Sequence, residues 1–172
     1  MVMKVMVFLQ GTTIMSDKFV GRPREERVRL SRERDPEILD SSRQVPIGDA
    51  VRKLQRWKDE GVELVYLSAH RKPENSAKVS SILDKYGFPK GLFVFRLGAE
   101  RYEDVAERIM PDVIVEDDCE SIGGEKEMVY PNIKPSLKNR IRSVDVREFE
   151  GIDHLPESVE KLGRSSTSHN RE

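Results

Sequence analysis

The sequence predicts an α/β fold, a three-layer sandwich whose central sheet is mostly parallel and five-stranded. Three observations predict it: short apolar runs alternate with stretches of helical period, glycine or proline marks most of the boundaries, and polar residues gather where the apolar runs end. Alternating strands and helices form parallel sheets with right-handed crossovers. Hydrophobic residues make up 37% of the 172 residues, which is enough for one core with two faces.

The first strand is expected at residues 3–9 (MKVMVFL), because a nearly continuous apolar run is typical of a strand buried on both faces. Residues 12–46 follow as a polar stretch that is crowded with Arg, Asp and Glu and has no clean period. This stretch is too long for an ordinary connection, so we expect an insertion that forms a small flap after the first strand. Acidic residues nearly neutralise its arginines, which favours a lid with ion pairs over a nucleic-acid arm.

Two pairs of a helix and a strand are expected after the flap. An apolar stripe predicts a helix at 47–60 that ends at Gly61, and a strand follows it at 62–68. The next helix is expected at 73–86, because it starts with proline and its apolar residues are spaced i, i+3, i+4 and i+7. The apolar run GLFVFRL then predicts a strand at 91–97.

The last third of the chain is expected to complete the sheet. A short helix at 102–110 stops before a proline and leads into a strand at 112–116, and the fifth strand is expected at 141–146. Residues 1–162 are therefore expected to form a single domain. The polar tail at 163–172 is expected to be disordered.

Charge, cysteine content and hydropathy exclude several classes of protein. The 30 Lys and Arg nearly balance the 31 Asp and Glu, which leaves no overall field to attract nucleic acid. One cysteine excludes an intrachain disulfide framework and a cysteine-rich zinc module. No apolar run approaches the roughly 18 residues of a membrane span, and the N-terminus lacks the cleavage site of a secretory signal. We therefore expect a cytoplasmic protein with neither nucleic-acid nor membrane partners.

Polar residues follow the first two strands, and the carboxyl ends of parallel strands meet at one edge of the sheet, where ligands bind. The candidates for binding a small anionic ligand are Gln10, Gly11, Thr12, Ser68, His70 and Arg71. The first three form a glycine-containing turn whose amides are suited to hold a phosphate. The others combine a hydroxyl with positive charge before a helix N-terminus, which suits an anion. The alternative is a helix cap or a solvated basic turn.

Asp117 and Asp118 come directly after the strand at 112–116. Their like charges repel unless a cation or hydrogen-bond donors are present, and carboxylates at an exposed strand end suit Mg²⁺. The pair is therefore the candidate metal site. Alternatively, one of the two acids caps the turn that begins at Cys119. The same carboxylates are expected to raise the pKa of the Cys119 thiol, which argues against a nucleophilic cysteine.

This order of parts resembles the haloacid dehalogenase-like (HAD-like) superfamily over roughly residues 3–124. The resemblance implies a HAD-like Rossmannoid fold in which the first strand ends in D-x-D-G-T, the first Asp attacks phosphorus and the second serves as acid and base. Here Phe8 and Gln10 stand at the two aspartate positions. A phenyl ring cannot form an aspartyl-phosphate, and a carboxamide does not transfer protons at neutral pH. The standard mechanism is therefore excluded.

The resemblance also assigns roles to the remaining polar residues. It implies that Ser68 contacts the phosphate, and that Asp117 and Asp118 hold Mg²⁺. The affinity for Mg²⁺ is expected to be weak, because the carboxylate of the first strand is missing. The lysine of the superfamily has no clear counterpart, and three residues stay open as the source of its charge: Lys90, Arg96 and Arg101.

Three functions remain open from the sequence. The first is a noncatalytic binder of a small phosphorylated or carboxylated ligand, or of a partner. The second is a divergent Mg²⁺-dependent phosphohydrolase in which a metal-activated water attacks and His70 carries the proton. The third is a structural or interaction module whose polar edge only caps strands. We favour the binder, because two catalytic groups are missing from one short segment.

Overall fold

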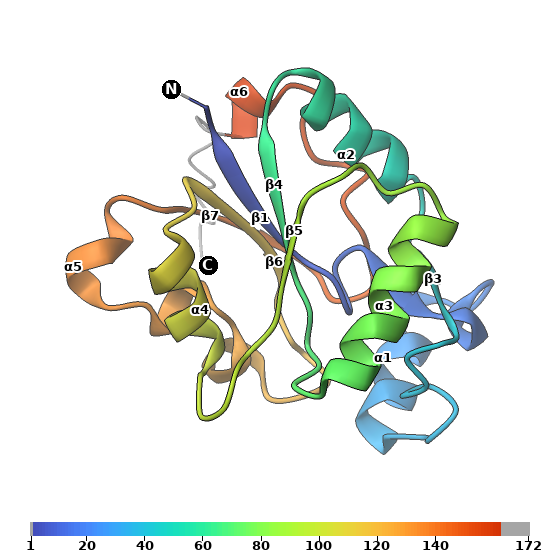
Figure 1. Ribbon diagram of the computed structural model, residues 1–172. Coiled ribbons are helices and arrows are strands. Elements are labelled where there is room, and N and C mark those ends of the chain that lie inside the picture. The colour runs from blue at the N-terminus through green and yellow to red at the C-terminus, as the bar shows by residue number, and fades with distance from the viewer. Residues whose placement is uncertain (1, 163–172) are drawn as a thin grey trace, which may run out of the picture.

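Five parallel strands form the central sheet of the protein (Figure 1). The computed structural model describes residues 2–162, so the expected disorder of 163–172 lies outside the described residues. The strands are β1 (Lys4–Phe8), β4 (Glu63–Leu67), β5 (Leu92–Val94), β6 (Val113–Asp117) and β7 (Arg142–Val146). Their order in the sheet is β5-β4-β1-β6-β7, and every neighbouring pair is parallel. The expected five-stranded parallel sheet is confirmed.

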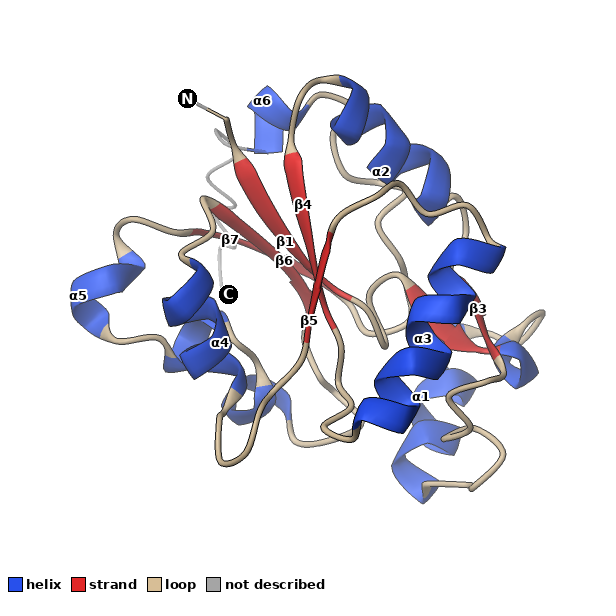
Figure 2. Ribbon diagram, in the orientation of Figure 1, coloured by secondary structure: helices blue, strands red, loops and turns tan. Residues whose placement is uncertain are grey.

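Helices cover both faces of this sheet (Figure 2). One face is covered by α2 (Ala50–Asp59), α3 (Pro73–Lys85) and α6 (Val159–Leu162), and the other by α4 (Tyr102–Ile109) and α5 (Pro135–Lys138). Two short 3-10 helices, η2 (Gly124–Glu127) and η3 (Tyr130–Asn132), lie between β6 and α5. The three-layer arrangement is therefore confirmed. Within residues 2–162, none of the helices combines the length and the apolar character that crossing a membrane requires.

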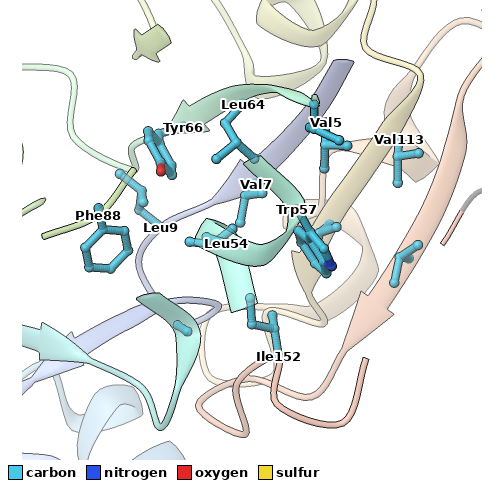
Figure 3. Packing of buried hydrophobic residues seen from close by; sticks show 14 of the residues in the cluster. Val5, Val7, Leu9, Leu54, Trp57, Leu64, Tyr66, Phe88, Val113 and Ile152 are labelled. Atoms are coloured by element: carbon cyan, nitrogen blue, oxygen red, sulfur yellow. The ribbon is translucent and has the colours of Figure 1, made fainter. Parts of the chain in front are cut away.

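Side-chain alternation along β1 divides the core into two halves. Val5 and Val7 face α2, where Leu54 and Trp57 are fully buried against the sheet (Figure 3). Met6 points to the opposite face, toward the helix α4. Both faces of β1 are apolar, which explains why its sequence is a continuous apolar run and not an alternating one.

The flap, residues 12–46, is inserted after β1 as expected. It contains β2 (Ile14–Ser16), the 3-10 helix η1 (Asp17–Phe19), α1 (Arg24–Glu33) and β3 (Gln44–Pro46). β2 and β3 pair in an antiparallel two-stranded sheet. Phe19, Val28 and Ile38 of the flap pack together with Phe149, which follows β7. The flap therefore shares a small core with a distant part of the chain.

Strands β5 and β6 differ from their expected bounds in ways that affect the edge of the sheet. β5 is only three residues long, and the chain leaves the sheet before Arg96. β6 continues through Asp117, which pairs with Val146 of β7, so this acid belongs to the strand and not to the loop after it. Glu116 and Asp117 are consequently both buried.

Candidate functional site

A cavity of about 550 Å³ lies between the carboxyl ends of the strands and the flap. Phe8 and Gln10 line it from the end of β1, whereas Phe19 and Ile38 line it from the flap. Phe149 belongs to the lining as well. The sequence predicted the edge of the sheet as the site, but the contribution of Phe149 was missed, because it follows β7 as an isolated apolar residue.

Phe8 gives the cavity an aromatic wall at the end of β1. Its side chain is mostly buried, and its ring meets the ring of Tyr102 edge-on with 5.1 Å between the centroids. Edge-on aromatic pairs are favourable contacts in their own right. Tyr102 also lines the cavity, which the sequence did not indicate, because Tyr102 reads only as the first residue of a helix.

Gln10 uses both ends of its carboxamide to bind the end of β4. Gln10 Nε2 donates to Ser68 Oγ at 3.1 Å, and the Ala69 N–H donates to Gln10 Oε1 at 2.8 Å. Ser68 is fully buried and Gln10, not Ser68, lines the cavity. Ser68 Oγ also accepts a hydrogen bond from the His70 N–H at 3.3 Å. The structure therefore brings Gln10, Ser68 and His70 together, but places Gln10 between Ser68 and the cavity.

The turn after β1 does not present free amides to a phosphate, which corrects the expectation for Gly11 and Thr12. The Gly11 N–H donates to the Ile14 carbonyl at 2.9 Å, and the Thr12 N–H donates to the Leu9 carbonyl at 3.1 Å. Gly11 has a φ of 89°, and a Cβ there would lie 2.9 Å from Asp117 Oδ2. Glycine is therefore required for the turn and for the close approach of Asp117.

Asp117 is held inside the protein by donors from the chain. Its Oδ2 accepts a hydrogen bond from the Thr12 hydroxyl at 2.8 Å, and its Oδ1 accepts one from the Cys119 N–H at 2.9 Å. Burial raises the pKa of Asp117 to about 7, and the nearby charge of Glu148 contributes to the rise. The hydrogen bond from Cys119 matches the alternative in which an acid of this pair caps the following turn.

Asp118 and Glu116 are also engaged by backbone amides. Asp118 Oδ1 accepts from the N–H groups of Glu120 and Glu148, at 3.3 and 3.1 Å, and Asp118 does not line the cavity. The Glu116 carboxylate accepts from the N–H groups of Val129 and Tyr130, at 2.6 and 2.9 Å. Burial raises the pKa of Glu116 to about 8. These acids therefore serve the turns around β6.

The donor set at this edge does not fit Mg²⁺. Magnesium needs oxygen ligands that converge on one point, usually one or two carboxylates with waters and a phosphate. Both oxygens of Asp117 already accept hydrogen bonds, and the Phe8 side chain at the end of β1 offers no oxygen. Among residues 2–162, no group of three or more His, Cys, Asp or Glu side chains is placed to hold a metal ion.

Cys119 is buried next to these acids. Burial raises the pKa of the Cys119 thiol, and the charges of Asp117 and Glu116 raise it further. The thiol is therefore kept protonated, as the sequence led us to expect, and it does not have the character of a nucleophile.

Arg96 is a cation on the wall of the cavity. Arg96 Nη2 donates to the Ala69 carbonyl at 2.8 Å, and its guanidinium carbon lies 3.9 Å from the centre of the Tyr102 ring. Its Nε is buried and has no hydrogen-bond partner within the described part of the chain. Burial lowers the pKa of Arg96, but a guanidinium remains charged at physiological pH.

The other two candidates for the superfamily's lysine lie elsewhere. Lys90 is exposed and does not line the cavity. Arg101 has a side chain that is 78% exposed and lies 3.8 Å from the Glu103 carboxylate. Arg96 is therefore the one of the three that the fold brings to the site.

His70 and Arg71 separate in space although they are neighbours in sequence. His70 lines the cavity, and burial together with the charges of Arg96 and Lys78 lowers its pKa. The protonated form of His70 is therefore disfavoured. Arg71 is exposed, donates to the carbonyls of Gly98 and Glu100, and does not line the cavity.

Comparison with known proteins supports the fold. No protein family model and no curated protein matches this chain. A chain of the Pnkp1/Rnl/Hen1 complex matches with a TM-score of 0.54 at 13% identity, covering 86% of this chain and 47% of that one. The class C acid phosphatase from Bacillus anthracis also has a TM-score of 0.54, at 10% identity, covering 87% of this chain and 69% of the phosphatase.

These similarities concern the fold alone. The chain spans about half the length of the complex subunit that it matches. The same acid phosphatase with tungstate bound matches with a TM-score of 0.53 at 10% identity, covering 88% of this chain and 69% of that one. The likeness to the phosphatase is a likeness in the α/β fold, whose centre in this chain is the five-stranded parallel sheet.

Proposed function

We propose that this protein binds a small ligand with one carboxylate or phosphate group in the cavity beneath the flap, and that it does not hydrolyse the ligand. The observation that carries the proposal is Arg96. Its guanidinium is half-buried at the cavity wall, and its Nε lacks a hydrogen-bond partner among the described residues; the charges of Glu127 and Glu103 act on it without forming a salt bridge. A partly buried charge is stabilised when an opposite charge joins it. An acidic ligand supplies that charge.

The remainder of the cavity suits an apolar body. Phe8, Tyr102 and Phe149 give it aromatic walls. The polar groups of the lining include His70, Gln10, Arg34 and the carboxylates of Asp117, Glu127 and Glu148. Small-molecule sites are typically apolar pockets with a few placed polar groups, and about 550 Å³ falls within their usual size. We therefore expect an aromatic or aliphatic acid to bind better than a bare anion.

The residues at the strand ends support binding without turnover. Phe8 has no nucleophilic atom, the Gln10 carboxamide does not act as an acid or a base at neutral pH, and Asp117 accepts hydrogen bonds from the chain itself. The acids at β6 also do not fit a magnesium site. The likeness to an acid phosphatase therefore extends to the fold and, in this proposal, not to its chemistry.

Binding is tested with benzoate and phenyl phosphate, and with acetate and inorganic phosphate as acids that lack an apolar body. Calorimetry is carried out on the wild type, Arg96→Gln and the control Arg108→Gln, an exposed arginine of α4 that pairs with Glu100. We expect the wild type and the control to bind the two aromatic acids alike. Arg96→Gln should weaken both by about tenfold or more, because a charge-assisted hydrogen bond is lost. Equal affinities in all three proteins would contradict the proposal.

Turnover is tested on phenyl phosphate, with Mg²⁺ and with a chelator, in the wild type and in Asp118→Asn. We expect no phosphate release above the level of the variant. Mg²⁺-dependent release that disappears in Asp118→Asn would instead establish a divergent hydrolase.

A further inference from the structure

Two hydrogen-bonding groups converge at the carboxyl end of β4. They are the Ser68 hydroxyl and the Ala69 N–H, and both are reached by the Gln10 carboxamide, at 3.1 and 2.8 Å. A hydroxyl next to a backbone N–H at a strand end is a place where an oxyanion is well bound. In this protein a neutral amide of the chain lies at that place.

The Gln10 carboxamide binds one of these two groups as an anion would and the other as an anion cannot. Gln10 Oε1 accepts from the Ala69 N–H, as an oxyanion would, but Gln10 Nε2 donates to Ser68 Oγ. The His70 N–H donates to the same Ser68 oxygen at 3.3 Å. Ser68 Oγ therefore accepts two hydrogen bonds. The Ala69 N–H, which a ligand oxygen at this place would need, is already bound by Gln10 Oε1.

The position of Gln10 also blocks the approach from the cavity. Gln10 lines the cavity, whereas Ser68 is fully buried and does not. Because the carboxamide is attached to the chain, its effective concentration at these donors greatly exceeds that of a free anion. A ligand must displace Gln10 before it can reach Ser68.

We infer that Gln10 determines ligand specificity by closing the oxyanion position at Ser68 and Ala69, so that the acid group of the ligand binds at Arg96. This inference deepens the proposed function and rests on it for the place of the ligand. The Gln10 carboxamide then occupies the place that a bound anion would take. A bare tetrahedral anion then has no site in the wild-type protein, and an acid binds only with the help of its apolar body.

The experiment removes the Gln10 carboxamide and uses inorganic phosphate as the probe. Melting temperatures are measured in excess phosphate and in chloride of equal ionic strength for the wild type, Gln10→Ala and Gln44→Ala. Gln44 is the matched control, because it is a second cavity-lining glutamine, and its Nε2 donates to the Asp40 carbonyl and not to β4. Comparing two salts within each variant cancels the effect of the substitution on basal stability.

We expect phosphate to raise the melting temperature of Gln10→Ala by about 2–4 °C, the shift produced when a ligand favours the folded state of a protein of this size by about fivefold. The wild type and Gln44→Ala should show no such rise. The double variant Gln10→Ala/Ser68→Ala should lose it, because the hydroxyl that faces the opened space is gone. Gln10→Asn, which withdraws the amide by one methylene, should gain the rise in part and serves if Gln10→Ala does not fold.

Two outcomes overturn the inference. One is the absence of a phosphate-dependent rise in both Gln10→Ala and Gln10→Asn when they are folded. The other is an equal rise in the wild type, which would mean that Gln10 does not keep phosphate from the position at Ser68 and Ala69. Failure of the proposed function gives a different result. If the wild type binds no aromatic acid, the phosphate-dependent rise in melting temperature of Gln10→Ala should still be found in Gln10→Ala/Arg96→Gln.

Discussion

The Thr12 hydroxyl is joined to Asp117 by two hydrogen bonds, one to the carboxylate and one from the backbone N–H. Thr12 Oγ1 donates to Asp117 Oδ2 at 2.8 Å and accepts from the Asp117 N–H at 3.0 Å. These contacts join the turn after β1 to the end of β6 in the buried interior. The geometry of the sheet edge therefore depends on this pair.

Replacing Thr12 with valine is expected to destabilise the protein by roughly 1–3 kcal/mol, because the isosteric side chain leaves one oxygen of the buried Asp117 carboxylate and the buried Asp117 N–H without a partner. Urea unfolding gives the free energy difference. Thr13→Val is the matched control, since the Thr13 hydroxyl is equally buried but contacts only the Phe8 and Leu9 carbonyls, at 3.3 and 3.4 Å. A control that loses as much stability as Thr12→Val would refute a special role for the pair.

The buried acids of β6 predict that stability falls as the pH rises. Burial raises the pKa of Glu116 to about 8 and that of Asp117 to about 7, above the values of about 4 in an unfolded chain. Between these values the folded state holds more protons than the unfolded state. The stabilisation is therefore complete below about pH 4 and is lost as the pH rises through 7 and 8.

The measurement is the free energy of unfolding at a series of pH values between 5 and 9. Glu116→Gln should flatten the decline between pH 5 and 8, because this side chain no longer titrates. A wild-type protein whose stability rises over this range would show that burial does not raise the pKa of these two acids.

Phe8→Leu is expected to weaken the binding of benzoate by several-fold, because it removes an aromatic wall of the cavity, and a contact between two aromatic rings is worth about 1 kcal/mol. Phe88→Leu provides the comparison: Phe88 also meets a tyrosine edge-on, Tyr66 at 6.1 Å, but does not line the cavity. Calorimetry should show reduced affinity only for Phe8→Leu. Equal affinity in the two variants would place the ligand away from Phe8.

The flap is expected to loosen in Arg24→Gln. Arg24 Nε donates to the Glu148 carbonyl at 2.9 Å, and its guanidinium also pairs with Glu120. Hydrogen exchange of residues 12–46 should become about fivefold to thirtyfold faster, as expected from a loss of roughly 1–2 kcal/mol in local stability. Arg29→Gln should leave exchange unchanged, because Arg29 pairs only with acids of α1 itself. A similar acceleration in both variants would show that helix α1, and not its attachment, had changed.

The strands were predictable from the sequence because buried strands are visible there as short apolar runs. β1 and residues 113–115 of β6 are apolar on both faces, and the helices between the two strands carry apolar stripes. Helix α1 has no apolar stripe, since Val28 is its only buried residue and the rest of its surface is largely charged. The sequence therefore indicated that a flap exists, without indicating what it contains.

The candidate site was predictable in position but not in its contacts. Gln10 and Ser68 are 58 residues apart, and nothing local indicates that a carboxamide reaches that hydroxyl. The same holds for Arg96, which local sequence does not distinguish from Lys90 or Arg101. Only the packing of Arg96 on Tyr102 selects it. Long-range hydrogen bonds decided the roles of the polar residues, and those depend on the assembled fold.

Trp57 gives this protein a built-in optical reporter. It is the only tryptophan of the chain, it is fully buried on the inner side of α2, and its Nε1 donates to the Pro156 carbonyl at 3.1 Å. It does not line the cavity. Its emission should therefore shift to the red when the core opens and stay constant when an acid binds under the flap, so that unfolding and ligand occupancy are recorded as separate signals in one titration.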